Sequence, residues 1–118
     1  MIQQDYLMRQ IEIVARTLAK LIFNKETTEY IVTDIFHSCL LGLIAERRID
    51  EAENLLFEKI EEEIEENPGG KKYLEIALDF YSRINDLETR VLDGCGFERE
   101  EIDEGIRAVA DLYGINII

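Results

Sequence analysis

Apolar residues recur at steps of three and four along most of the chain, which is the spacing of a helix that buries one face. The opening stretch has this spacing at Leu7, Ile11, Val14 and Leu18, with Leu21 or Ile22 continuing it. No long segment alternates apolar and polar residues as a half-buried strand does. The pattern therefore predicts an all-α protein that opens with an amphipathic helix within residues 1–24.

Two helices are predicted within residues 28–66, as a first helix pair. The earlier one runs from about Thr28 to Glu46 and has one face formed by Ile31, Ile35, Cys39 and Leu43, which Phe36 and Leu40 widen. A helix that is apolar around much of its circumference is expected to be central. For the later helix, Asp50 followed by Glu53 resembles a capping box and places the helix start there.

The stretch from Asn67 to Gly70 contains the only proline and is the clearest break in the sequence. A second helix pair is predicted within residues 71–113, with one helix from about Lys72 to Asp93 and another from about Glu98 to Tyr113. An apolar tail, residues 114–118, is expected to pack back onto the body. The whole chain, 1–118, then forms a single domain of five antiparallel helices.

Helical hairpins of this size stack in repeat proteins, and a faint internal repeat is present. The sequence Ile49-Asp50-Glu51-Ala52 is followed 53 residues later by Ile102-Asp103-Glu104-Gly105. The turn and the aromatic positions of a true tetratricopeptide repeat are missing. We therefore expect tetratricopeptide-like helix pairing rather than the repeat itself.

A second, smaller apolar strip lies on the opening helix, away from its main stripe. At 100° per residue, Ile2, Tyr6 and Ile13 cluster on another side of the helix from Leu7. The main stripe suits packing on the protein's own core, so these three side chains are left to face outward. We interpret Ile2, Tyr6 and Ile13 as a possible interface, and we expect a homodimer.

Charge is divided unevenly between the two parts of the chain. Residues 1–48 carry six basic and six acidic residues, whereas residues 49–118 carry seven basic and twenty acidic ones, which is the whole net charge of −13. Such a surface repels phosphate backbones and anionic lipid, so neither nucleic acid nor a membrane is expected as a partner. A basic peptide or protein segment is favoured instead.

The opening helix contains Asp5 and Glu12, which are wrong for an organelle presequence. No stretch is apolar over the roughly 18 residues that span a bilayer. Two cysteines, Cys39 and Cys95, are too few for a disulfide framework and are expected to be reduced. These features predict a cytoplasmic location.

The densest set of potential ligands is a row of carboxylates at Glu58, Glu61, Glu62 and Glu65, spaced along one side of a helix. Carboxylate-bridged metal bundles use such rows but add histidines from two helices. This chain has one histidine, His37, three residues after Asp34. The row is therefore interpreted as a solvated face. A metal site completed by a second His37 across a dimer stays open as an alternative.

No motif places a nucleophile beside His37, and the glycines after Pro68 lack the spacing of a phosphate-binding loop. We therefore expect neither an enzyme nor a cofactor.

Three stretches resemble a known family: Asp5-Tyr6-Leu7-Met8-Arg9-Gln10-Ile11, Ile49-Asp50-Glu51-Ala52-Glu53-Asn54-Leu55-Leu56, and Gly96-Phe97 followed by Glu101-Ile102. The chain is similar over nearly its full length to a domain-of-unknown-function family of small helical proteins from Gram-positive bacteria. The resemblance implies a helical fold and no catalytic residues.

Together these features predict a protein–protein interaction or scaffold module, with an interhelical groove that takes a peptide or protein. The alternative is a dimeric enzyme or metal-binding protein that uses His37 with acidic side chains.

Overall fold

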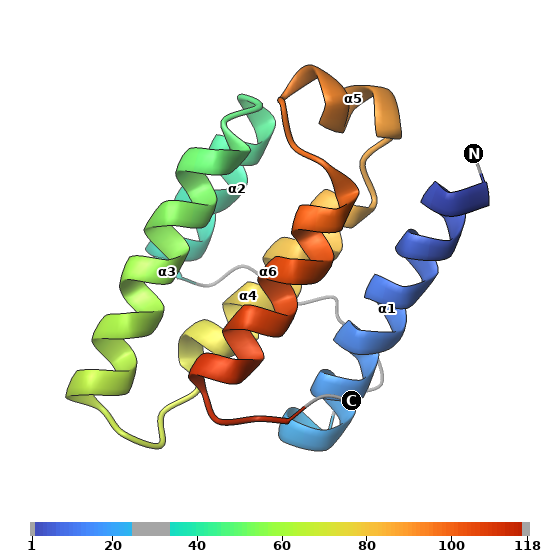
Figure 1. The fold of residues 1–118 in the computed structure, drawn as a ribbon. Helices are drawn as coiled ribbons and strands as arrows, with labels where there is room; N and C mark the ends of the chain where they lie inside the picture. The colour runs from blue at the N-terminus through green and yellow to red at the C-terminus, as the bar shows by residue number, and fades with distance from the viewer. Residues whose placement is uncertain (1, 25–33, 117–118) are drawn as a thin grey trace.

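A computed structural model describes residues 2–24 and 34–116, and within these ranges the chain is helical with no strand. The helices are α1 (Ile2–Phe23), α2 (Ile35–Ala45), α3 (Ile49–Glu66), α4 (Lys72–Asn85), α5 (Thr89–Gly94) and α6 (Arg99–Leu112) (Figure 1). The predicted all-α class is confirmed. The predicted number of five helices is wrong, because the described residues form six.

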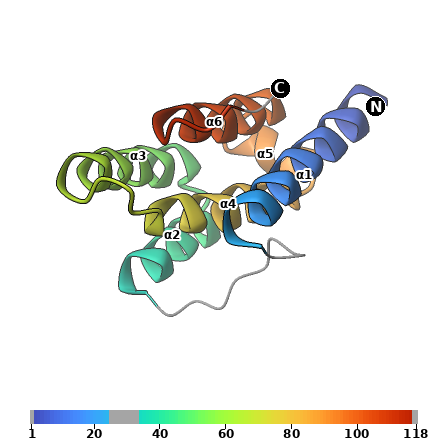
Figure 2. The ribbon, with the colours of Figure 1, turned by 90° about the horizontal axis from the view of Figure 1, so that it is seen from below.

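The centre of the fold is α4, which packs against α1, α2, α3 and α6. Figure 2 shows α3 and α6 on one side of α4 and α2 on the opposite side. One face of α4 buries Leu74, Leu78, Tyr81 and Ile84 completely, and its other faces bury Ile76 and Phe80 as well. The prediction that the helix within residues 28–46 is central is therefore wrong.

Helix α2 begins later than predicted. Asp34 has an extended backbone and its Oδ1 accepts a hydrogen bond from the backbone N–H of His37 (3.1 Å), so Asp34 is the N-cap. The predicted start near Thr28 and the core position Ile31 lie outside the described residues.

The buried face of α2 also differs from the prediction. Ile35 is 91% exposed and Cys39 is exposed, whereas the buried residues are His37, Leu40, Leu43 and Ile44. Leu40 and Leu43 are buried as predicted. Periodicity misplaced the rest of the buried face because apolar residues surround most of this helix.

The predicted capping box at Asp50 and Glu53 is not formed, since α3 already begins at Ile49. Arg47 takes a left-handed backbone (φ 64°), and the N–H of Arg48 donates to the carbonyl of Leu43 (2.8 Å). This tight turn ends α2 and places Arg48 at the N-cap position of α3, where its side chain makes no capping hydrogen bond.

The helix predicted from Lys72 to Asp93 is broken at residues 86–88 into α4 and α5. The guanidinium of Arg99, which is 2% exposed, fills the break. Its Nη1 donates to the Asn85 carbonyl (2.6 Å) and its Nη2 to the Leu87 carbonyl (2.9 Å). Carbonyls freed at a helix end need such donors, and a cation there also matches the negative end of the helix.

Helix α1 packs its main stripe (Ile11, Val14, Ala15 and Leu18) inward and contacts α4 and α6. At the other end of the chain, Gly114 has φ 73° and the N–H of Ile115 donates to the Ala110 carbonyl (2.9 Å), which ends α6. Ile115 packs against the core. Ile117 and Ile118, the rest of the expected tail, lie outside the described residues.

An acidic groove as the candidate functional site

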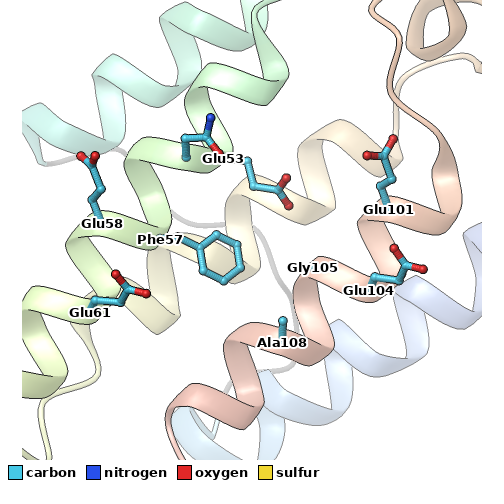
Figure 3. A pocket seen from close by; sticks show the side chains of 9 residues that line it. Glu53, Phe57, Glu58, Glu61, Glu101, Glu104, Gly105 and Ala108 are labelled. Carbon is cyan, nitrogen blue, oxygen red and sulfur yellow. The ribbon is translucent and has the colours of Figure 1, made fainter.

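An open groove of about 680 Å³ runs between α3 and α6. Its wall on α3 is formed by Glu53, Asn54, Phe57, Glu58 and Glu61, and its wall on α6 by Glu101, Glu104, Gly105 and Ala108. Figure 3 shows the Phe57 ring between the two helices, with the Glu53 carboxylate pointing from α3 toward α6. The groove therefore combines five carboxylates with one aromatic ring.

The floor of the groove is set by Gly105, which is buried in α6. A β-carbon at this position would lie 2.5 Å from the Tyr81 Oη and 2.7 Å from the Glu53 Oε2. Because Gly105 has no side chain, the fully buried Tyr81 of α4 reaches the groove and donates its hydroxyl to the Glu53 carboxylate (2.6 Å). Glu53 is thereby fixed in place before any partner arrives.

Burial raises the pKa of Glu53, and the nearby charges of Glu101 and Asp50 add to this effect, while the hydrogen bond from Tyr81 opposes it. Burial likewise raises the pKa of Tyr81, so its hydroxyl stays protonated and continues to donate. Glu53 is thus a carboxylate that would gain from a cation more than an exposed one does.

The remaining carboxylates of the groove also lack cations. Glu101 accepts a hydrogen bond from the backbone N–H of Glu98 (2.7 Å) at the start of α6. Among the described residues, no ion pair engages Glu58, Glu61 or Glu104. The groove is therefore a concentrated, uncompensated negative surface.

The carboxylate row that the sequence singled out is divided by the fold. Glu58 and Glu61 line the groove, whereas Glu62 pairs with Lys59 (3.5 Å) and Glu65 is exposed elsewhere on α3. Sequence reasoning did not identify the other groove residues as a site, although Glu53, Glu104 and Gly105 occur in stretches that it noted. In the ranges 2–24 and 34–116, no three His, Cys, Asp or Glu side chains gather closely enough to hold a metal ion.

His37 is 3% exposed and pairs with the buried Asp79 of α4 (Nε2 to Oδ2, 2.5 Å). Asp79 also accepts from the Nε of Arg83 (2.6 Å). This network holds α2 on α4, and it lies away from the groove lining.

A buried carboxylate that the sequence did not reveal is Glu63, at the end of α3. Its oxygens accept from the backbone N–H groups of Lys72 (3.0 Å) and Tyr73 (3.1 Å), and from the Tyr113 hydroxyl (2.5 Å). Burial raises the pKa of Tyr113, and the bond to Glu63 adds to the effect. Glu63 thus caps α4 from a neighbouring helix, since the N-cap residue Lys71 makes no side-chain cap.

The possible interface on α1 is partly described. Tyr6 is 62% exposed and Ile13 is 52% exposed, so both face outward as expected. The side chain of Ile2 lies outside the described residues.

Fold and groove define an all-helical protein with an acidic interhelical surface, and no described helix has the length and apolarity to cross a bilayer. The chain belongs to a family of unknown function (DUF6483), whose model matches residues 1–114. The predicted membership of a domain-of-unknown-function family is confirmed. No curated protein and no solved structure matches the chain.

Proposed function

We propose that the protein is an interaction module that binds a basic segment of a protein partner in the groove between α3 and α6. The observation that carries this proposal is the set of five groove carboxylates that no described cation neutralises. Arginine guanidinium groups bind carboxylates with paired, charge-assisted hydrogen bonds. A partner rich in arginine or lysine would therefore supply the cations that these carboxylates lack.

The aromatic ring in the groove supports the same class of ligand. Phe57 is partly exposed between the two walls. A cation held within about 6 Å of such a ring gains roughly 0.5–2 kcal/mol. Phe57 also offers apolar area to the alkyl stem of a lysine or arginine side chain.

The groove is rigid where it is deepest, and this favours binding over nonspecific attraction. Glu53 is held by Tyr81, which is fully buried in the central helix. A side chain that is already ordered loses little conformational entropy when a ligand arrives.

The test is a titration of a fluorescein-labelled peptide, about twelve residues long with alternating arginine and leucine, followed by fluorescence anisotropy. We expect Glu58→Lys/Glu61→Lys to weaken binding at least tenfold. The matched control, Glu65→Lys/Glu66→Lys, changes the net charge equally on the same helix but outside the groove, and it should weaken binding less than threefold. Equal loss in both variants, or no binding to the wild type, would refute a groove-specific role.

Three finer features belong to this proposal. The tight turn between α2 and α3, and the packing of α4 on α6, support tetratricopeptide-like antiparallel pairs. The free thiol of the exposed Cys39 supports a cytoplasmic location. A bacterial source is proposed from the resemblance to small helical proteins of Gram-positive bacteria. Within the described residues, no observation favours the alternative of a dimeric enzyme or metal-binding protein.

A further inference from the structure

The outward side of α1 carries charges of both signs. At 100° per residue, Arg9 and Arg16 lie about 140–160° around the helix from the buried Ile11. Both arginines are exposed, and so are Asp5 and Glu12, which precede them by four residues. Within the part of the chain that the structure describes, none of these four side chains forms an ion pair. This side of α1 therefore presents two cations and two anions to a partner.

The charged residues and two exposed apolar residues occupy adjacent flanks of this side. The four charged residues lie within about 60° of one another around the helix, and Tyr6 and Ile13 lie beyond Arg9, within about 20° of each other. Tyr6 is 62% exposed and Ile13 is 52% exposed. When two antiparallel helices are related by a two-fold axis, each flank meets the same flank of the other copy. In such a pair, charged residues would face charged residues and apolar residues would face apolar ones.

The order of the charges along α1 is self-complementary when a second copy runs in the opposite direction. The point midway between residues 10 and 11 is the midpoint of Asp5 and Arg16, and it is also the midpoint of Arg9 and Glu12. An antiparallel copy centred on this point places Asp5 at the level of Arg16 of the second copy. It likewise places Arg9 at the level of Glu12 of the second copy. Each of the four charges then meets a charge of opposite sign.

The same register brings the apolar residues together. At 1.5 Å per residue, Tyr6 lies within about 3 Å, along the helix axis, of Ile13 of the second copy. This contact occurs twice, once on each side of the two-fold axis. Lys20, a further charged residue on this side of α1, lies at the level of residue 1 of the second copy and so outside the four charge pairs.

The charge of the protein favours a second copy as the occupant of this face. The chain carries a net charge of −13, so two copies repel each other over most of their surfaces. The four charges on the outward side of α1 sum to zero, and the antiparallel register opposes each to its opposite. A partner of a single sign, whether basic or acidic, would instead meet two like charges.

We propose that two copies of this chain associate through an antiparallel, two-fold pairing of the outward sides of their α1 helices. Helix α1 forms one edge of the fold, and it lies on the opposite flank of α6 from α3 (Figures 1 and 2). The pairing therefore leaves the acidic groove between α3 and α6 open. The inference goes beyond the proposed function, because it concerns a different surface.

Sedimentation equilibrium over a range of protein concentrations tests the association, and circular dichroism verifies that each variant is folded. We expect the wild type to reach twice the monomer mass at the higher concentrations. Ile13→Glu should raise the dissociation constant of the dimer by about tenfold or more, because it places a carboxylate on the apolar flank. The control Ile35→Glu changes an isoleucine of α2 that is 91% exposed, and it should leave the dissociation constant within about threefold of the wild type.

Exchange of charges tests the register. Arg9→Glu and Glu12→Lys should each weaken self-association by about threefold or more, since each creates two contacts between like charges. An equimolar mixture of these two variants, one of them fluorescently labelled, should form a mixed dimer about as tightly as the wild type forms its own. The matched control mixes Arg9→Glu with Asp5→Lys, which also exchanges charge on this side of α1 but not between facing positions. That mixture should remain weakly associated.

A wild type that is monomeric at every concentration would overturn the proposal. So would equal association in the two mixtures, because that result indicates a general attraction between opposite charges. The groove variant Glu58→Lys/Glu61→Lys should keep the wild-type dimer. Its dissociation into monomers would show that the groove, rather than α1, holds the two copies together.

Discussion

Gly105→Ala is expected to destabilise the protein, although alanine is the better helix former. In a helix that tolerates the side chain, replacing glycine by alanine gains roughly 0.5–1 kcal/mol. At Gly105 the new β-carbon would lie 2.5 Å from Tyr81 Oη and 2.7 Å from Tyr81 Cζ. Tyr81 is fully buried in α4, so its ring has little room to move.

The loss can be estimated from the contacts involved. Forcing extra volume into a packed core costs about 1–3 kcal/mol. Displacing Tyr81 also breaks its 2.6 Å hydrogen bond to Glu53, and bonds to charged groups contribute about 1.5–3 kcal/mol. Set against the helix gain, the net loss is about 2–5 kcal/mol, or roughly 10–20 °C in Tm for a domain of this size.

Urea denaturation followed by circular dichroism measures this difference, with Gly42→Ala as the control. Gly42 lies within α2, is exposed, and would place a β-carbon with no atom within 4 Å. That variant should be more stable than wild type by about 0.5–1 kcal/mol. If Gly105→Ala is as stable as wild type or more so, the close packing of Gly105 against Tyr81 at the groove floor is refuted.

Two further predictions concern charged residues. Because the pKa of Glu53 is raised above its ordinary 4.5, the folded state binds a proton more tightly than the unfolded state. Wild type therefore loses stability as the pH rises from below 4.5 through the raised pKa of Glu53. Glu53→Gln removes this loss, so in urea denaturation its advantage over wild type should be larger at pH 7 than at pH 4; equal differences would contradict the assignment. Arg99→Met leaves the Asn85 and Leu87 carbonyls without donors and should cost about 3 kcal/mol in the same assay, whereas the exposed control Arg90→Met should stay within about 0.5 kcal/mol.

The helical class was predictable because burial repeats with the helical period. The stripe of α1 faces inward as predicted at Ile11, Val14 and Leu18, since this helix has one apolar and one polar side. Helix α2 lacks that contrast, so its periodicity predicted the burial of Leu40 and Leu43 correctly but that of Ile35 and Cys39 wrongly. The break between α4 and α5 was not predictable from local sequence, because it depends on Arg99, fourteen residues from Asn85.

The groove was predictable only in part. The sequence identified Glu58 and Glu61 as members of a carboxylate row and expected a groove between helices. It gave no means of finding the opposite wall, because Glu101 and Glu104 lie forty or more residues away and approach α3 only through the packing of both helices on α4. The helical glycine at position 105 was the one local signal, since a buried glycine within a helix indicates a close approach.

The net charge of a long stretch of sequence does not show which surface of the folded protein carries the charged side chains. Residues 1–48 are neutral overall, which argued for no particular partner, and residues 49–118 argued for a basic ligand supplied from outside. Once α1 is placed with its main stripe inward, Arg9 and Arg16 are left on its outward side next to Tyr6 and Ile13. Asp5 and Glu12, which are also exposed, lie four residues before these arginines on the same side of the helix, so this face carries charges of both signs. For this reason, the groove between α3 and α6, and not the outward face of α1, is the surface whose charge selects a basic partner.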